Sequence, residues 1–211
     1  MASNDKPRNQ YQIIRKDARN CFVEVKSDSF TLGKMHLEFA AYDLNRPSGQ
    51  RQTNHVHIYV DAAEFLHLAH FILQGSCHSQ MLACKKNAEL TNRPLYQSLG
   101  GTSAQRLVQY GRPRNDGMSL SRSIKLFAGQ KADYLLCAES GPGEADAKGL
   151  IVPRYGNKPE QKVSVSLSIA HLNELMLMAT AHYNAWLSNW YSNNYQPFET
   201  KNGKVDGTVM S

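Results

Sequence analysis

The chain has 211 residues, of which 41% are hydrophobic and 20% charged, so it is long enough to bury a core and is not typical of a disordered segment. No apolar run reaches the roughly 18 residues of a spanning helix, and the first ten residues, MASNDKPRNQ, lack the apolar stretch of a signal peptide. Four widely spaced cysteines exclude a disulfide-dense secreted scaffold. We therefore expect a cytoplasmic protein without a membrane partner.

The net charge of +6 is distributed unevenly along the chain. Residues 1–60 hold nine basic and six acidic side chains, and residues 101–162 hold ten basic and six acidic ones. The rest of the chain adds no net positive charge. The excess favours an anionic partner, and it falls in the two segments in which β-strands are predicted.

The first half of the chain begins with polar residues without periodicity, so residues 1–10 are expected to be a flexible end. Strands are then predicted where apolar and polar side chains alternate, over residues 21–26, 34–42 and 55–60. Asp61 is predicted to cap a helix that ends at Gly75, and a second helix is predicted over residues 80–90. These elements form a first unit, residues 11–90.

Residues 91–117 are rich in glycine and proline, which predicts a linker with a short helical piece at residues 103–109. The second unit, residues 118–193, shows the same alternation, which predicts strands over residues 123–127, 134–138, 149–152 and 163–167. A loop is predicted at residues 140–143. Ser168 is predicted to cap a long helix that reaches about residue 191, and residues 194–211 are expected to be a flexible tail.

The junction between strand and helix occurs twice. Residues 55–72 are HVHIYVDAAEFLHLAHFI, and residues 162–179, a shift of 107, are KVSVSLSIAHLNELMLMA. In both, alternating apolar residues precede a capping residue, Asp61 or Ser168. Any two such junctions share some features, but the joint match of alternation, cap and helix stripe favours a duplication. The predicted fold is α+β, a duplicated unit of antiparallel sheet followed by a helix, packed as a pseudo-dimer.

This organisation resembles the Whirly and positive-cofactor-four class of single-stranded-DNA-binding proteins over about residues 11–193. The resemblance rests on the two junction sequences, and the KGKAAL motif of plant Whirly proteins does not occur in the chain. It implies single-stranded DNA or RNA as the ligand, no catalysis, and no metal or other cofactor. It also implies a phage or a conjugative element as the setting.

Basic and aromatic side chains on the strands are the candidate nucleic-acid contacts, because cations follow phosphates and rings stack on bases. Tyr59 is out of phase with the apolar residues of its strand and is predicted to face away from the core. Arg154 and Tyr155 are adjacent at a strand end. The predicted set is Arg15, Lys16, Arg19, Lys26, Lys34, Arg51, Tyr59, Arg122, Lys125, Lys131, Tyr134, Arg154, Tyr155, Lys158 and Lys162. Arg46, Arg112 and Arg114 are further basic candidates.

Metal binding and catalysis are not predicted. Five potential zinc ligands fall within residues 67–84 without CxxC or HxxxH spacing: His67, His70, Cys77, His78 and Cys84. His55 and His57 share the strand face of Tyr59, which places them where nucleic acid is expected to bind. No P-loop, GxGxxG, GxSxG or HExxH motif occurs, so no enzyme activity is expected.

Two other functions compete with single-strand binding. The first is a protein-interaction or scaffold role in a DNA-transfer or phage complex, and the second is regulation through duplex DNA. Trp186 and Trp190 lie four residues apart on the long predicted helix, a spacing that indicates packing between the helices or across an interface between copies. A homo-oligomer is therefore expected.

Overall fold

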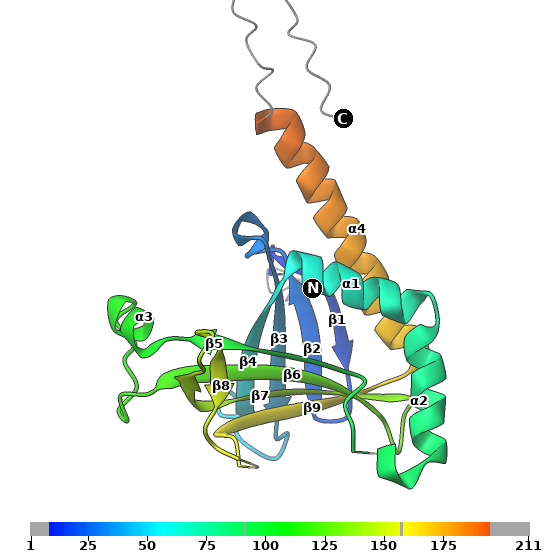
Figure 1. The fold of residues 1–211 in the computed structure, drawn as a ribbon, viewed down its shortest axis with the longest axis horizontal. Coiled ribbons are helices and arrows are strands. Elements are labelled where there is room, and N and C mark those ends of the chain that lie inside the picture. The colour runs from blue at the N-terminus through cyan, green and yellow to red at the C-terminus, as the bar shows by residue number, and fades with distance from the viewer. Residues whose placement is uncertain (1–8, 91, 157, 195–211) are drawn as a thin grey trace, which may run out of the picture.

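The computed structural model describes residues 9–90, 92–156 and 158–194, and in these residues two antiparallel sheets are combined with four α-helices (Figure 1). The predicted α+β class is confirmed. The expected flexible ends, 1–10 and 194–211, lie almost entirely outside the described residues. Among the described residues, no helix combines the length and the apolar character that crossing a membrane requires.

The first sheet has four strands in chain order, each antiparallel to the next: β1 (Gln12–Asp17), β2 (Cys21–Lys26), β3 (Lys34–Tyr42) and β4 (Gln52–Asp61). The strands predicted at 21–26 and 34–42 have the predicted bounds, and the one at 55–60 lies within β4. Sequence analysis did not predict β1. Only Ile13 of that strand is buried, so no apolar alternation marks it.

The second sheet has five strands: β5 (Tyr96–Thr102), β6 (Ser119–Ala128), β7 (Tyr134–Ala145), β8 (Ile151–Pro153) and β9 (Gln161–Leu167). β7 pairs with β6 along one side and with both β8 and β9 along the other. β5 lies in the segment that the sequence predicted as a linker. The second sheet therefore begins within that segment.

The loop predicted at residues 140–143 is instead part of β7, where Ser140 pairs with Arg122 and Gly143 pairs with Ser119. Its glycines serve packing, because a Cβ on Gly141 would lie 2.8 Å from the ring of Tyr155. In β5, a Cβ on Gly101 would lie 2.2 Å from the carbonyl oxygen of Leu120. Both glycines are therefore required by close approach within the second sheet rather than by a turn.

The α-helices are α1 (Ala62–Leu73), α2 (Ser76–Lys86), α3 (Ala104–Gln109) and α4 (Ile169–Asn194), with short 3-10 turns η1 (Phe30–Leu32) and η2 (Ala88–Leu90). Gly75, at a φ of 87°, separates α1 from α2, so the second helix begins earlier than predicted. Ser168 accepts a hydrogen bond from the His171 N–H (3.1 Å), which confirms the predicted cap. Asp61 makes no capping bond, because its carboxylate pairs with Lys34 (2.7 Å).

One face of each sheet contributes to a single core, which α1 and α4 complete. The strands of the second sheet run across those of the first, and the second sheet extends beyond the first together with α3 (Figure 1). Phe39 from β3, Leu126 from β6 and Leu175 from α4 are each at most 1% exposed. The two sheets therefore share one hydrophobic core.

Helix α4 projects away from the two sheets at its C-terminal end (Figure 1). Near the sheets, Tyr183 and Trp186 pack against Phe30, with ring centroids 5.1 and 5.7 Å from it. Further along, the Trp190 side chain is 44% exposed and touches Tyr191 edge-on. Trp186 thus packs against Phe30 of η1, while an interface between copies at Trp190 stays a prediction.

Candidate functional site

Tyr134 does not take the role that the sequence analysis predicted for it. It has the strand parity of Leu136 and Ala138 in β7, so its ring points into the core and is only 2% exposed. A stacking ring must present a face to the solvent. Tyr134 is therefore a core residue.

The outer face of the first sheet, which is turned away from the core, carries ion pairs rather than unpaired cations. Lys26 lies in β2 against Glu24 (3.4 Å) and against Glu38 of β3. Arg15 of β1 pairs with Asp17 (2.6 Å) and lies 3.6 Å above the ring of Phe22. The basic side chains predicted on these strands are largely neutralised within the sheet.

The outer face of the second sheet is organised around Glu139, which is 7% exposed. Lys125 of β6 and Lys162 of β9 hold this carboxylate from either side, at 2.9 and 2.8 Å. Burial acts to raise the pKa of Glu139, but the two lysines outweigh it and the pKa lies below its ordinary value. Lys125 and Lys162, two of the predicted nucleic-acid contacts, are thus both ion-paired with Glu139.

Replacing Glu139 with Gln should lower the free energy of unfolding at pH 7 by about 1–2 kcal/mol, because two partly buried lysines lose their counter-charge. A carboxylate with a depressed pKa in the folded state stabilises fully above its unfolded pKa, about 4.3. This contribution disappears as the pH falls through the lower folded value. Urea denaturation should therefore separate variant and wild type at pH 7, and the difference should shrink as the pH falls below about 4.3.

The matched control is Glu89→Gln, an exposed acid whose replacement should change the free energy of unfolding by less than about 0.5 kcal/mol. A Glu139→Gln deficit of equal size at pH 7 and pH 3 would contradict the charge-pair account.

The remaining predicted residues are spread over the surface. Lys16 points toward α4 and pairs with Glu174, and Arg154 pairs with Glu144 (3.1 Å). Arg51 donates to the carbonyl oxygen of Arg46 (3.2 Å). Lys131 and Lys162 line a pocket of about 440 Å³ on the outer face of the second sheet. The other three predicted residues lie in loops, where Arg19 and Lys158 are exposed and Tyr155 is half-buried.

A larger concavity of about 730 Å³, the intersheet groove, lies where the second sheet extends past the edge strand β4 of the first. Residues from β4, β5, β6, α3 and the turn before β8 line it. Its basic side chains are Lys34, Arg106, Arg112, Arg114 and Arg122, and its acidic ones are Asp61 and Glu64. The groove is therefore lined by more basic than acidic side chains.

Three of these arginines have no carboxylate partner among the described residues: Arg106, Arg112 and Arg122. Arg122 has the strand parity of the core residues Ile124 and Leu126, but β6 has by then passed the first sheet. Its guanidinium therefore reaches the groove and donates to Thr102 Oγ1 (2.9 Å). Burial lowers the pKa of Arg122, and an arginine remains charged at neutral pH all the same.

The two other basic side chains of the groove are already ion-paired, and its acid Glu64 accepts a hydrogen bond from the Tyr96 hydroxyl (2.8 Å). Arg114 is held by Asp116 (2.6 Å) and by Glu160 (2.7 Å), both outside the groove lining, and these bonds raise its pKa. Lys34 is paired with Asp61 across the end of β3 and β4. The available positive charge of the groove thus comes from the three unpaired arginines.

Two tyrosines present ring surface at the groove. The Tyr59 side chain, on β4, is 46% exposed, as predicted from its strand parity, and its ring stacks on His36 with centroids 4.4 Å apart. Tyr110, directly after α3, is 65% exposed. The groove therefore combines cations with exposed aromatic faces.

Sequence analysis included Lys34, Tyr59, Arg112, Arg114 and Arg122 among its candidates but missed Arg106 and Tyr110. Both come from the segment predicted as a linker. The signal that indicates them is local: Ser103 caps α3 by accepting from the Arg106 N–H (3.3 Å), and Leu107 is the buried anchor of the helix. Residues 106 and 110 are four apart, so they share one side of this turn.

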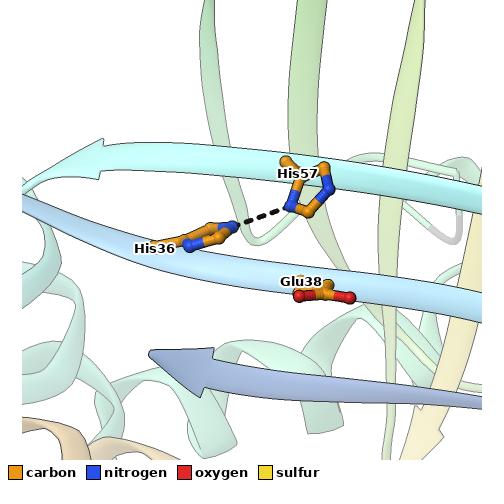
Figure 2. A group of neighbouring side chains, drawn as sticks. All are labelled: His36, Glu38 and His57. Atoms are coloured by element: carbon orange, nitrogen blue, oxygen red, sulfur yellow. Dashed lines mark hydrogen bonds between the residues drawn. The ribbon is translucent and has the colours of Figure 1, made fainter. Parts of the chain in front are cut away.

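A second group of ionisable side chains lies on the outer face of the first sheet. Three potential metal-ligand atoms lie within 4.8 Å of one another, from His36 and Glu38 of β3 and His57 of β4. Figure 2 shows these three side chains close together. We call this group the histidine cluster. The zinc candidates weighed from sequence, residues 67–84, are not part of it.

Comparisons of this chain with protein-family models, with curated proteins and with solved structures give no match. Functional inference for this protein therefore rests on the intersheet groove and the histidine cluster.

Proposed function

We propose that this protein binds single-stranded nucleic acid, DNA in the first instance, along the intersheet groove. The observation that carries the proposal is the meeting of three arginines without carboxylate partners and two exposed tyrosines in one hollow. A single strand offers the complementary chemistry, a chain of phosphates with bases that can turn toward a ring.

In this proposal the arginines contact phosphates and the tyrosines stack on bases. Arg106 and Arg112 come from α3 and the chain that follows it, and Arg122 comes from β6, so they can contact successive phosphates. Tyr59, from β4, and Tyr110, directly after α3, offer base-stacking faces, and a stacked base contributes roughly 1–3 kcal/mol. Every base has a π-face, so we expect weak sequence preference.

The proposal includes the duplicated, Whirly-like architecture. Its support is that each sheet is followed directly by a helix, with α1 beginning after Asp61 and α4 beginning at Ile169, two residues after Leu167 ends β9. Both helices pack into one core, which is the arrangement expected of a pseudo-dimer. The groove would then lie at one end of the contact between the two units.

The proposal is tested by titrating a fluorescently labelled oligo(dT) with the protein and recording anisotropy at 50 and 200 mM salt. If three phosphates are neutralised, the affinity should fall about 20-fold between these concentrations, since the logarithmic slope is near −0.7 per phosphate for single strands. A duplex of equal length should compete poorly, because its bases are not free to stack.

Failure to bind oligo(dT) at 50 mM salt would exclude the proposal. Equal competition by the duplex would instead favour a regulator of duplex DNA.

A further inference from the structure

The histidine cluster is built by the register of two neighbouring strands. His36 and Glu38 are alternate residues of β3, so both side chains lie on its outer face. His57 of β4 stands directly opposite Glu38 in the antiparallel ladder. All three side chains therefore project from the same face of the first sheet, and Figure 2 shows them turned toward one another.

The donor atoms are close enough to share one ion. His36 Nε2 and His57 Nδ1 are 2.9 Å apart, and a Glu38 oxygen lies within 4.8 Å of both. Two nitrogens bound to zinc at about 2.05 Å in tetrahedral geometry are separated by about 3.4 Å. An ion would therefore require the two rings to separate by only a few tenths of an ångström.

The surroundings of His36 are those of a ligand held in place. Its Nδ1 donates to the Asp28 carboxylate (2.8 Å), so its Nε2 lone pair accepts from the Nδ1–H of His57 (2.9 Å). An ion between the two rings would take the place of this proton, and His57 would then carry its proton on Nε2. A carboxylate behind the far nitrogen of a histidine is the usual support of a metal-bound imidazole. The stacked ring of Tyr59 fixes the orientation of His36 from the side, and the His36 side chain is only 2% exposed.

Glu38 also has other partners. Its two oxygens accept from His55 (2.6 Å) and from Lys26, so the carboxylate is held in position. Each carboxylate oxygen has a second lone pair, so Glu38 can keep a bond to His55 while it coordinates an ion.

We infer that His36, His57 and Glu38 form a binding site for one divalent transition-metal ion of the zinc class. Two imidazole nitrogens and one carboxylate oxygen are donors that suit Zn²⁺ and Co²⁺, whereas Mg²⁺ and Ca²⁺ prefer oxygen donors alone. Three protein ligands leave the fourth tetrahedral position for water or an anionic group. Tyr59 contacts both this site and the intersheet groove, but the inference does not depend on the proposed function.

The test uses the full chain without a polyhistidine tag, treated with a chelator and dialysed. Co²⁺ is titrated while visible absorption is recorded, and Zn²⁺ is then added in competition with a chromogenic chelator. One Co²⁺ per chain with d–d bands, displaced by one Zn²⁺, is the expected result. His57→Ala and Glu38→Gln should each weaken Zn²⁺ binding at least tenfold, as losing a ligand costs no less than losing a supporting partner.

The matched control is the double variant His67→Ala and His70→Ala, which removes two exposed histidines of α1 and should bind Zn²⁺ as the wild type does. His57 and Glu38 are chosen because they are half-buried, so their replacement disturbs the core less than replacement of His36 would. Circular dichroism identifies which of the two variants is folded. One folded variant is enough for the test. The inference is overturned if the wild type shows no stoichiometric binding at micromolar metal. It is equally overturned if a folded His57→Ala or Glu38→Gln variant binds Zn²⁺ as tightly as the wild type.

Discussion

Replacing Arg106 and Arg112 together by Glu should weaken the binding of oligo(dT) about 100-fold at 50 mM salt. Each arginine contributes a charge-assisted contact to a phosphate, worth roughly 1.5 kcal/mol, and 1.4 kcal/mol corresponds to a factor of ten in affinity. Neither side chain has an ion-pair partner among the described residues, and both are exposed. The free energy of unfolding should therefore stay within about 0.5 kcal/mol of the wild-type value.

The control for this variant is Lys86→Glu with Arg93→Glu, which changes the net charge by the same amount at two exposed positions outside the groove. Its affinity for oligo(dT) should remain within about threefold of the wild-type value. Equal losses in the two double variants would mean that net charge alone, rather than the groove, governs binding.

Truncating Phe65 to Ala should lower the free energy of unfolding by about 3–5 kcal/mol, the range for a buried phenylalanine. Phe65 is 1% exposed, and it lies where α1 meets Leu37 of the first sheet, Ile124 of the second and Leu172 of α4. Because this core is shared, urea denaturation of the wild type should show one cooperative transition, displaced but still single in the variant.

Leu177→Ala is the control for Phe65, since the Leu177 side chain on α4 is 54% exposed and its loss should cost less than about 0.5 kcal/mol. Two separate transitions, with only one of them moved by Phe65→Ala, would show that the two sheets fold independently.

Sequence predicts those strands in which large apolar residues recur at every second position. In β3, Met35, Leu37 and Phe39 all enter the core, so the strand could be assigned to the residue. In β5, five of the seven side chains are half-buried and the two others are exposed, so no alternation of buried and exposed side chains exists, and its glycines indicated a linker. Pairing with β6, a contact between distant residues, is what makes it a strand.

The candidate site was predicted only in part for a related reason. Strand parity placed Tyr59 on the outside correctly. Tyr134 was included only because it is an aromatic residue on a strand, and its parity with Leu136 and Ala138 puts its ring in the core. The pairing of Lys125 with Glu139 depends on the register of β6 and β7. Arg122 reaches the groove because the second sheet extends beyond the first.

The measurement that tests the groove most directly is the salt dependence of oligo(dT) binding by the wild type and by the Arg106→Glu, Arg112→Glu variant, compared side by side. If both arginines contact phosphates, the wild-type slope of log affinity against log salt should be steeper by about 1.4 than the slope of the variant. Equal slopes for the two proteins, or no binding by the wild type at 50 mM salt, would contradict the assignment of the groove as the nucleic-acid site.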